Sequence, residues 1–143
     1  MKKPTMIVRL VGAAGLMLAS ALTSAEVVVI VNSASAVNSA SADDIAQVFL
    51  GKRSEISGST FVAVDQAEGN TARGTFYDKV VQKSASQLNA YWSRLIFTGK
   101  GAPPQQLGSD GEVAEAVADD EEAIGYIDSS AVIDGVKVIY TVK

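Results

Sequence analysis

The sequence predicts an α/β fold in which helices flank a mixed, mostly parallel sheet. Short β-branched runs alternate with amphipathic segments of helical period, in the order β-α-β-α-α-α-β-β. Several of the helical segments begin at a Ser that can cap them, and glycines follow or separate the elements. There is no internal repeat and no second domain boundary, so residues 26–143 are expected to form one domain.

The first half of this domain predicts two strands and one helix. Residues 26–31 read EVVVIV, a continuous β-branched run typical of a buried, mostly parallel strand. Residues 32–40 are small and predict a loop. Ser41 is expected to cap the next helix, which carries acidic residues in its first turn and ends at Gly51. Residues 60–64 (TFVAV) predict the second strand.

The second half predicts three helices and two strands. A helix is expected over about 70–82, and Ser-x-x-Gln and Ser-x-x-Glu capping boxes mark the next two. A connecting loop is expected between these two, and strands follow the last helix. The segments are the box Ser84–Gln87 with the stripe Leu88, Tyr91, Trp92, Leu95 and Ile96, the loop 98–108, the box Ser109–Glu112, and the strands 123–127 and 136–142.

The N-terminal 25 residues predict a secretory signal peptide. Lys2, Lys3 and Arg9 precede a short apolar run over 10–19, and small residues lead to Ala25, after which cleavage is expected. The apolar run is shorter than the ~20 residues that span a bilayer, so a retained membrane anchor is the weaker alternative. A periplasmic or secreted location follows, with no membrane insertion after cleavage.

Composition excludes several classes of function. After removal of residues 1–25, nine basic residues face 16 acidic ones, a net charge of −7 that gives no reason to bind nucleic acid. The chain has no His and no Cys, which removes Ser-His-Asp and Cys-His catalysis and the usual zinc ligands. No cofactor is expected. Because no spacing of carboxylates suggests a catalytic pair, a non-enzymatic role is expected.

Several segments, taken in order, resemble the second lobe of the phosphate-type solute-binding proteins of ABC transporters. The turn 64–76 (VDQAEGNTARGTF) resembles the anion-binding turn of that family, E-G-S-G-T-R followed by Phe. The other matching segments are 32–37, 41–53 (SADDIAQVFLGKR), 91–104 (YWSRLIFTGKGAPP) and 123–127 (AIGYI). The resemblance implies one lobe of a type II periplasmic-binding-protein-like fold, with inorganic phosphate or a similar oxyanion as ligand and an ABC permease or another protein as partner. The family's first lobe is missing.

The candidate oxyanion site is the turn of Gly69, Asn70, Thr71 and Arg73. A helix that begins near Asn70 would present unsatisfied backbone N–H groups and the positive end of its dipole. The resemblance places Gly69 and Arg73 on the family's anion-binding positions. Asn70, Thr71 and Ala72 stand where the family has Ser, Gly and Thr, and Gln66 stands where it often has an Arg. The alternative for Arg73 is an ordinary ion pair, with Glu68 as the partner.

Other residues have two readings each. Ser33 and Ser35 could add hydroxyls to the same pocket, because strand-end loops collect at one side of such a sheet, or they could belong to a plain loop. Tyr91 and Trp92 could stack on a ligand, but their helical spacing favours the core. A single-lobe module that binds another protein, or itself as a homodimer, is the alternative function.

Overall fold

A five-stranded sheet with the order β5-β4-β6-β1-β7 organises the fold. The computed structural model describes residues 26–143, so the predicted signal peptide and its cleavage after Ala25 lie outside the described residues. The strands of this sheet are β1 (Val27–Asn32), β4 (Val62–Gln66), β5 (Gln105–Leu107), β6 (Ala123–Asp128) and β7 (Val136–Thr141). A separate hairpin consists of β2 (Glu55–Ile56) and β3 (Ser59–Thr60).

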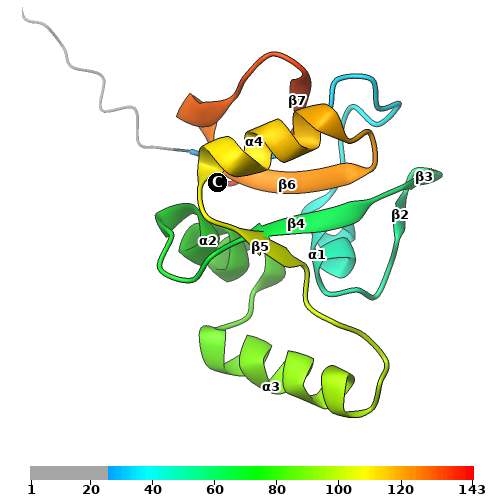
Figure 1. The fold of residues 1–143 in the computed structure, drawn as a ribbon, viewed down its shortest axis with the longest axis vertical. Coiled ribbons are helices and arrows are strands. Elements are labelled where there is room, and N and C mark those ends of the chain that lie inside the picture. Colours follow the sequence, from blue (N-terminus) through cyan, green and yellow to red (C-terminus); the bar gives the residue numbers. More distant parts are fainter. Residues whose placement is uncertain (1–25) are drawn as a thin grey trace, which may run out of the picture.

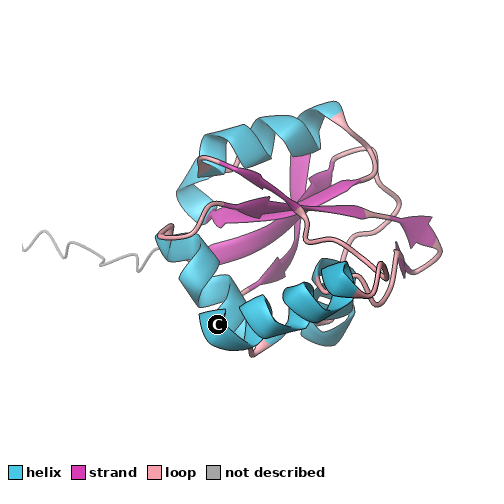
Figure 2. Ribbon diagram, turned by 60° about the horizontal axis from the view of Figure 1, so that its bottom comes forward, coloured by secondary structure: helices cyan, strands magenta, loops and turns pink. Residues whose placement is uncertain are grey.

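Helices lie on both faces of the sheet, which gives a three-layer α/β fold (Figure 2). One face carries α4 and the opposite face carries α1 and α2, while α3 is set apart from the sheet (Figure 1). The helical elements are α1 (Ala42–Phe49), α2 (Thr71–Phe76), the π-helical turn η1 (Tyr77–Val81), α3 (Ala85–Phe97), α4 (Asp110–Asp119) and the 3₁₀ turn η2 (Ser129–Ala131).

The sheet is mixed and mostly parallel, as the sequence predicts. β4 runs parallel to both β5 and β6, whereas β1 is antiparallel to β6 and to β7. Four strands therefore share one direction and β1 alone opposes them. The expectation that residues 26–31 form a parallel strand is wrong. Their unbroken apolar run reflects burial on both faces, which a central strand has whatever the direction of its neighbours.

Side chains of β1 point alternately into two apolar clusters. Val27, Val29 and Val31 join the cluster beneath α1 and α2, and Val28 and Ile30 join the cluster beneath α4. All five are at most 4 % exposed. β1 therefore supplies apolar contacts to both layers of helices, which explains the absence of polar alternation in its sequence.

Helix starts follow the predicted capping chemistry. The Ser41 hydroxyl accepts from the Asp44 amide at the start of α1, and the capping box of Ser84 and Gln87 is complete at the start of α3. At α4 the box is only half formed. The Ser109 hydroxyl accepts from the Glu112 amide as predicted, but the Glu112 carboxylate accepts from Gly108 N instead of from Ser109 N.

Three expectations change in the structure. The predicted loop 98–108 contains β5. The predicted helix 70–82 divides into α2 and η1, and Gln82, directly after η1, has a φ of 58°. The apolar stripe of α3 is mostly outside the core. Leu88 alone is buried, Tyr91 and Trp92 are half-buried, and Ile96 is 55 % exposed. The helical spacing was correct, but none of the described elements covers most of this stripe of α3.

Within residues 26–143, no helix has the length and apolar character required to span a membrane.

Candidate functional site

The predicted oxyanion turn lies where β4 ends and α2 begins. Gly69 has φ of +89°, a left-handed conformation that favours Gly, and an added Cβ would meet nothing within 4 Å. Asn70 follows as the N-cap of α2. The chain therefore turns sharply at an open position before it enters the helix, as the sequence predicts.

Asn70 satisfies part of the helix start with its own side chain. Its Oδ1 accepts from Ala72 N at 2.8 Å and from Arg73 N at 3.4 Å. Two of the backbone donors expected to face a ligand are thus engaged in capping. Thr71 is exposed to solvent at the first position of the helix.

Arg73 forms an ion pair, and its partner is Asp65 instead of the predicted Glu68. Arg73 Nη1 lies 2.7 Å from Asp65 Oδ2 and donates to the Gln66 carbonyl at 2.9 Å. The guanidinium also lies over the ring of Tyr77, 4.7 Å from its centroid. Burial lowers the pKa of Arg73, but the nearby Asp65 charge and the two phenols outweigh this effect, and the pKa is raised overall. Arg73 is therefore a fixed cation.

Asp65 is the centre of a buried polar network. Its carboxylate accepts from the hydroxyl of Tyr77 at 2.5 Å, from the hydroxyl of Tyr126, and from Gln66 N at 2.7 Å. Burial, followed by the Asp65 charge, raises the pKa of both phenols, which therefore keep their protons. The Tyr126 ring stacks on Phe76 with centroids 4.1 Å apart, so the network is packed directly against the apolar core.

Two cavities meet at Arg73. The larger, of about 480 Å³, is bounded by the turn 68–70, by Arg73 and Gly74 of α2, and by residues at the start of α3. A smaller one of about 220 Å³ lies toward Trp92, and Asp65 and Arg73 are in its wall. Lys83 adds a second cation to the larger cavity, whereas Glu68 and Asp78 add negative charge. Thr71 is not among the lining residues of either.

Ser33 and Ser35 are not brought to this site. Val31 of β1 and Ala63 of β4 both pair with Ile124, but the two strands run in opposite directions. The loop after β1 therefore lies at the edge where β4 begins, and the oxyanion turn lies at the edge where β4 ends. Ser35 instead caps its own loop by accepting from Val37 N. The rule that strand-end loops gather at one edge holds only for parallel strands.

Comparisons with known proteins identify the fold. No family model matches the chain, and no curated protein matches it. Among solved structures, an ABC-type phosphate transport receptor from Vibrio cholerae is similar with a TM-score of 0.65 and 16 % identity, over 80 % of this chain and 45 % of that one.

Two further solved binding proteins are similar in fold over the same share of this chain. A phosphate ABC transporter substrate-binding protein from Clostridium perfringens, solved with bound phosphate, has a TM-score of 0.61 and 20 % identity over 80 % of this chain and 44 % of that one. PstS from Borrelia burgdorferi has a TM-score of 0.60 and 12 % identity over 80 % and 46 %.

The chain has the fold of part of a phosphate-type binding protein. It spans less than half the length of the three solved structures, consistent with one lobe. The resemblance seen in the sequence is thereby confirmed for the fold.

Sequence reasoning missed the most important partners of Arg73. Asp65 lies eight residues before Arg73 across an irregular turn, and Tyr126 reaches Asp65 from 61 residues away. Tyr77 is closer, one turn after Arg73 in a helical segment, where a side chain stacked on the guanidinium could have been expected from the spacing of four. No comparable local signal indicates Tyr126.

Proposed function

We propose that this chain is an exported, non-enzymatic oxyanion-binding lobe, with inorganic phosphate as the first ligand to test, that serves ABC-type phosphate uptake or sensing. Export is supported by the signal-peptide pattern of residues 1–25, and the ligand class by the fold shared with phosphate-binding proteins.

The observation that carries this proposal is the position of Arg73 in the walls of both cavities. Among the described residues, its recorded hydrogen bonds all use Nη1. A ligand oxygen would accept from Nε or Nη2, neither of which donates to Asp65 or Gln66, while Asp65 and Tyr77 hold the guanidinium in place. Gly69 and Asn70 form the adjacent wall of the larger cavity, so the proposed ligand contacts are Arg73, Gly69 and Asn70, without Thr71, which lines neither cavity.

The test is isothermal titration of the purified protein with phosphate, with sulfate as the competing oxyanion. Asn70→Asp is the most informative variant, because Asp caps a helix as well as Asn and is nearly the same shape. It places a negative charge in the cavity wall, so phosphate affinity is expected to fall by about tenfold or more.

Asn38→Asp is the matched control. Asn38 is exposed in the loop after β1, at the opposite edge of the sheet, and the substitution changes the net charge equally. It is expected to leave phosphate binding unchanged. Absence of heat with the unaltered protein at millimolar phosphate would refute the proposal. An equal loss of phosphate affinity in the two variants would refute the location of the site.

A second candidate function is a protein-interaction module. The observation that favours it is the exposure of apolar side chains on α3, where Phe97 is 91 % exposed. A large apolar side chain in that position stabilises nothing in the lone chain, and exposed apolar patches mark interaction surfaces.

A further inference from the structure

The end of α3 combines apolar and cationic side chains that the other described residues, 26–143, leave uncovered. Ile96 is 55 % and Phe97 91 % exposed. Arg94 lies one turn before Thr98, and Lys100 follows the helix, both exposed. These four residues, Arg94, Ile96, Phe97 and Lys100, are called the α3 tip below. Residues 79–109 carry four basic residues and no acidic residue, so nothing in this stretch neutralises the tip.

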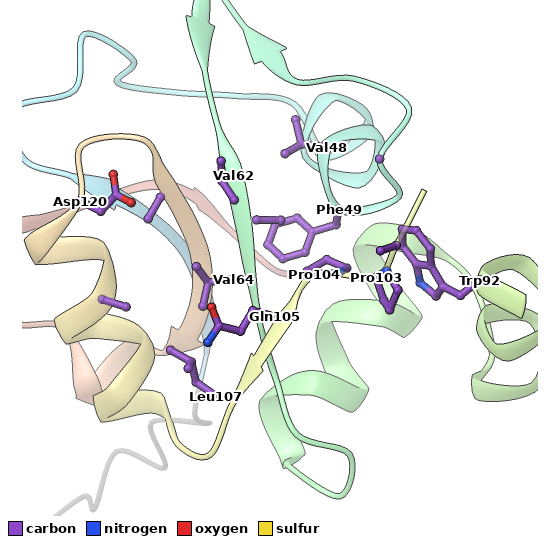
Figure 3. A pocket seen from close by; sticks show the side chains of 15 residues that line it. Val48, Phe49, Val62, Val64, Trp92, Pro103, Pro104, Gln105, Leu107 and Asp120 are labelled. Carbon is purple, nitrogen blue, oxygen red and sulfur yellow. The ribbon is translucent and has the colours of Figure 1, made fainter. Parts of the chain in front are cut away.

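A second groove, with a mostly apolar lining, is a candidate to receive such a tip. It has a volume of about 520 Å³, and Figure 3 shows the side chains that line it. It is open because β5 pairs only with residues 64–66 of β4 and leaves Val62 uncovered, 58 % exposed. We call it the β4 groove, and its apolar lining includes Phe49, Val62, Val64, Trp92, Pro103 and Pro104.

The one charged residue that lines the β4 groove is Asp120, whose charge is opposite to that of the tip. Asp120 lies at one end of the groove, and Trp92 lies toward the other (Figure 3). Asp119, Glu121 and Glu122 flank Asp120 in the sequence and are exposed. Residues 110–128 carry eight acidic residues and no basic one. The cationic and apolar α3 tip and the apolar β4 groove, with Asp120 in its lining, thus occur in one chain on segments of opposite charge.

The tip does not fill the groove of its own chain, because Phe97 remains almost fully exposed. We propose that the β4 groove receives the α3 tip of a second copy of this chain, with Phe97 as the inserted side chain and Lys100 and Arg94 facing Asp120. A two-fold arrangement forms this contact twice, since each copy supplies one tip and one groove. This inference goes beyond the proposed ligand. Because Ile96, Trp92 and Pro103 also line the smaller cavity beside Arg73, association is tested without phosphate.

The opposed charges also explain how two copies with the same net negative charge can associate. Attraction between the tip and Asp120 acts over a few ångströms, whereas repulsion between the two whole molecules is screened beyond about 8 Å at physiological salt. Association is therefore expected to weaken, but not to vanish, between about 0.05 M and about 0.5 M salt, because the apolar contact is not screened.

The experiment is sedimentation velocity of the purified protein across micromolar concentrations, without phosphate. Phe97→Ser removes the large apolar side chain of the α3 tip, and Val62→Asp places a charge in the apolar lining of the β4 groove. Both positions are exposed. Each is expected to weaken association by more than about tenfold. A mixture of the two variants is decisive. Phe97→Ser retains an intact β4 groove and Val62→Asp retains an intact α3 tip, so the two variants should form a heterodimer through one contact.

Lys100→Glu tests the charge component, with Lys143→Glu as a matched control at the C-terminus. Lys100→Glu is expected to weaken association, whereas Lys143→Glu is expected to leave it unchanged. The proposal is overturned by an unaltered protein that stays monomeric at high micromolar concentration, including one that instead binds anionic lipid vesicles through Phe97. It is equally overturned if Phe97→Ser and Val62→Asp associate as well as the unaltered protein, or if their mixture forms no heterodimer, or if both Lys variants weaken association alike.

Discussion

The buried Asp65 and the partly buried Arg73 form an ion pair, with 2.7 Å between Asp65 Oδ2 and Arg73 Nη1, that joins the end of β4 to α2. The pair fixes the position of Arg73, which lines the same cavity as Gly69 and Asn70. A residue proposed to bind a ligand is therefore also part of the structural framework. Loss of either partner should affect folding as well as binding.

Asp65→Ala should strongly destabilise the protein. The substitution leaves Arg73 and the hydroxyls of Tyr77 and Tyr126 without their shared acceptor in the interior. Breaking a buried pair costs about 3–5 kcal/mol of the free energy of unfolding. Arg53→Ala is the matched control, because Arg53 pairs with Asp44 at the surface and such pairs contribute about 0–1 kcal/mol. Urea denaturation measures the free energy of unfolding of both variants. Similar losses of this free energy would show that the Asp65 network contributes no more than a surface pair.

Alkaline pH should destabilise the fold through Tyr77 and Tyr126. Burial and then the Asp65 charge raise the pKa of both in the folded state, whereas in the unfolded chain a phenol titrates near pH 10. Below about pH 10 both states hold the proton and the contribution to stability is complete. Above it the unfolded chain releases protons that the folded chain keeps, so the free energy of unfolding falls as the pH rises.

Absorbance of phenolate at rising pH checks this directly. Of the four tyrosines, Tyr77 and Tyr126 should ionise only as the protein unfolds. Tyr77→Phe should remove one equivalent from this late phase and make the decline of stability with pH shallower. A late phase that is unchanged in Tyr77→Phe and in Tyr126→Phe would contradict the assignment.

Gly125→Ala should destabilise the contact between β6 and α4. A Cβ at this position would lie 2.5 Å from Val113 Cγ1, and Val113 is β-branched and fully buried, with little freedom to move away. Overpacking of this kind costs about 1–3 kcal/mol.

Gly74→Ala is the matched control, because an added Cβ there meets nothing within 4 Å and Ala is favoured over Gly in a helix by roughly 0.5–1 kcal/mol. In thermal denaturation, the melting temperature should fall in Gly125→Ala and rise in Gly74→Ala. Combining Gly125→Ala with Val113→Ala should cost less than the sum of the single changes, since each relieves the crowding or cavity that the other creates. Strict additivity would contradict direct contact as the cause.

Local signals in the sequence predicted most of the elements. Ser41 and Ser84 cap helices that begin where expected, and Asn70 caps α2 at the start predicted for the helix after the second strand. These features could be predicted because a capping side chain bonds to amides two or three residues away, within one short segment. The same holds for the β-branched run of β1, whose burial is confirmed along its whole length.

Only the tertiary structure decided which residues meet. The opposite direction of β1 separates Ser33 and Ser35 from the candidate site, and no feature of residues 26–31 indicates that direction, because both faces of the strand are buried either way. The partner of Arg73 was likewise a choice between carboxylates of similar distance in sequence, settled by the buried position of Asp65 between Tyr77 and Tyr126. The helical period of residues 85–97 determined which side chains share a stripe. Whether that stripe would be covered depended on the packing of α3 against the rest of the chain, which sets the exposure of Phe97 and which a local pattern does not contain.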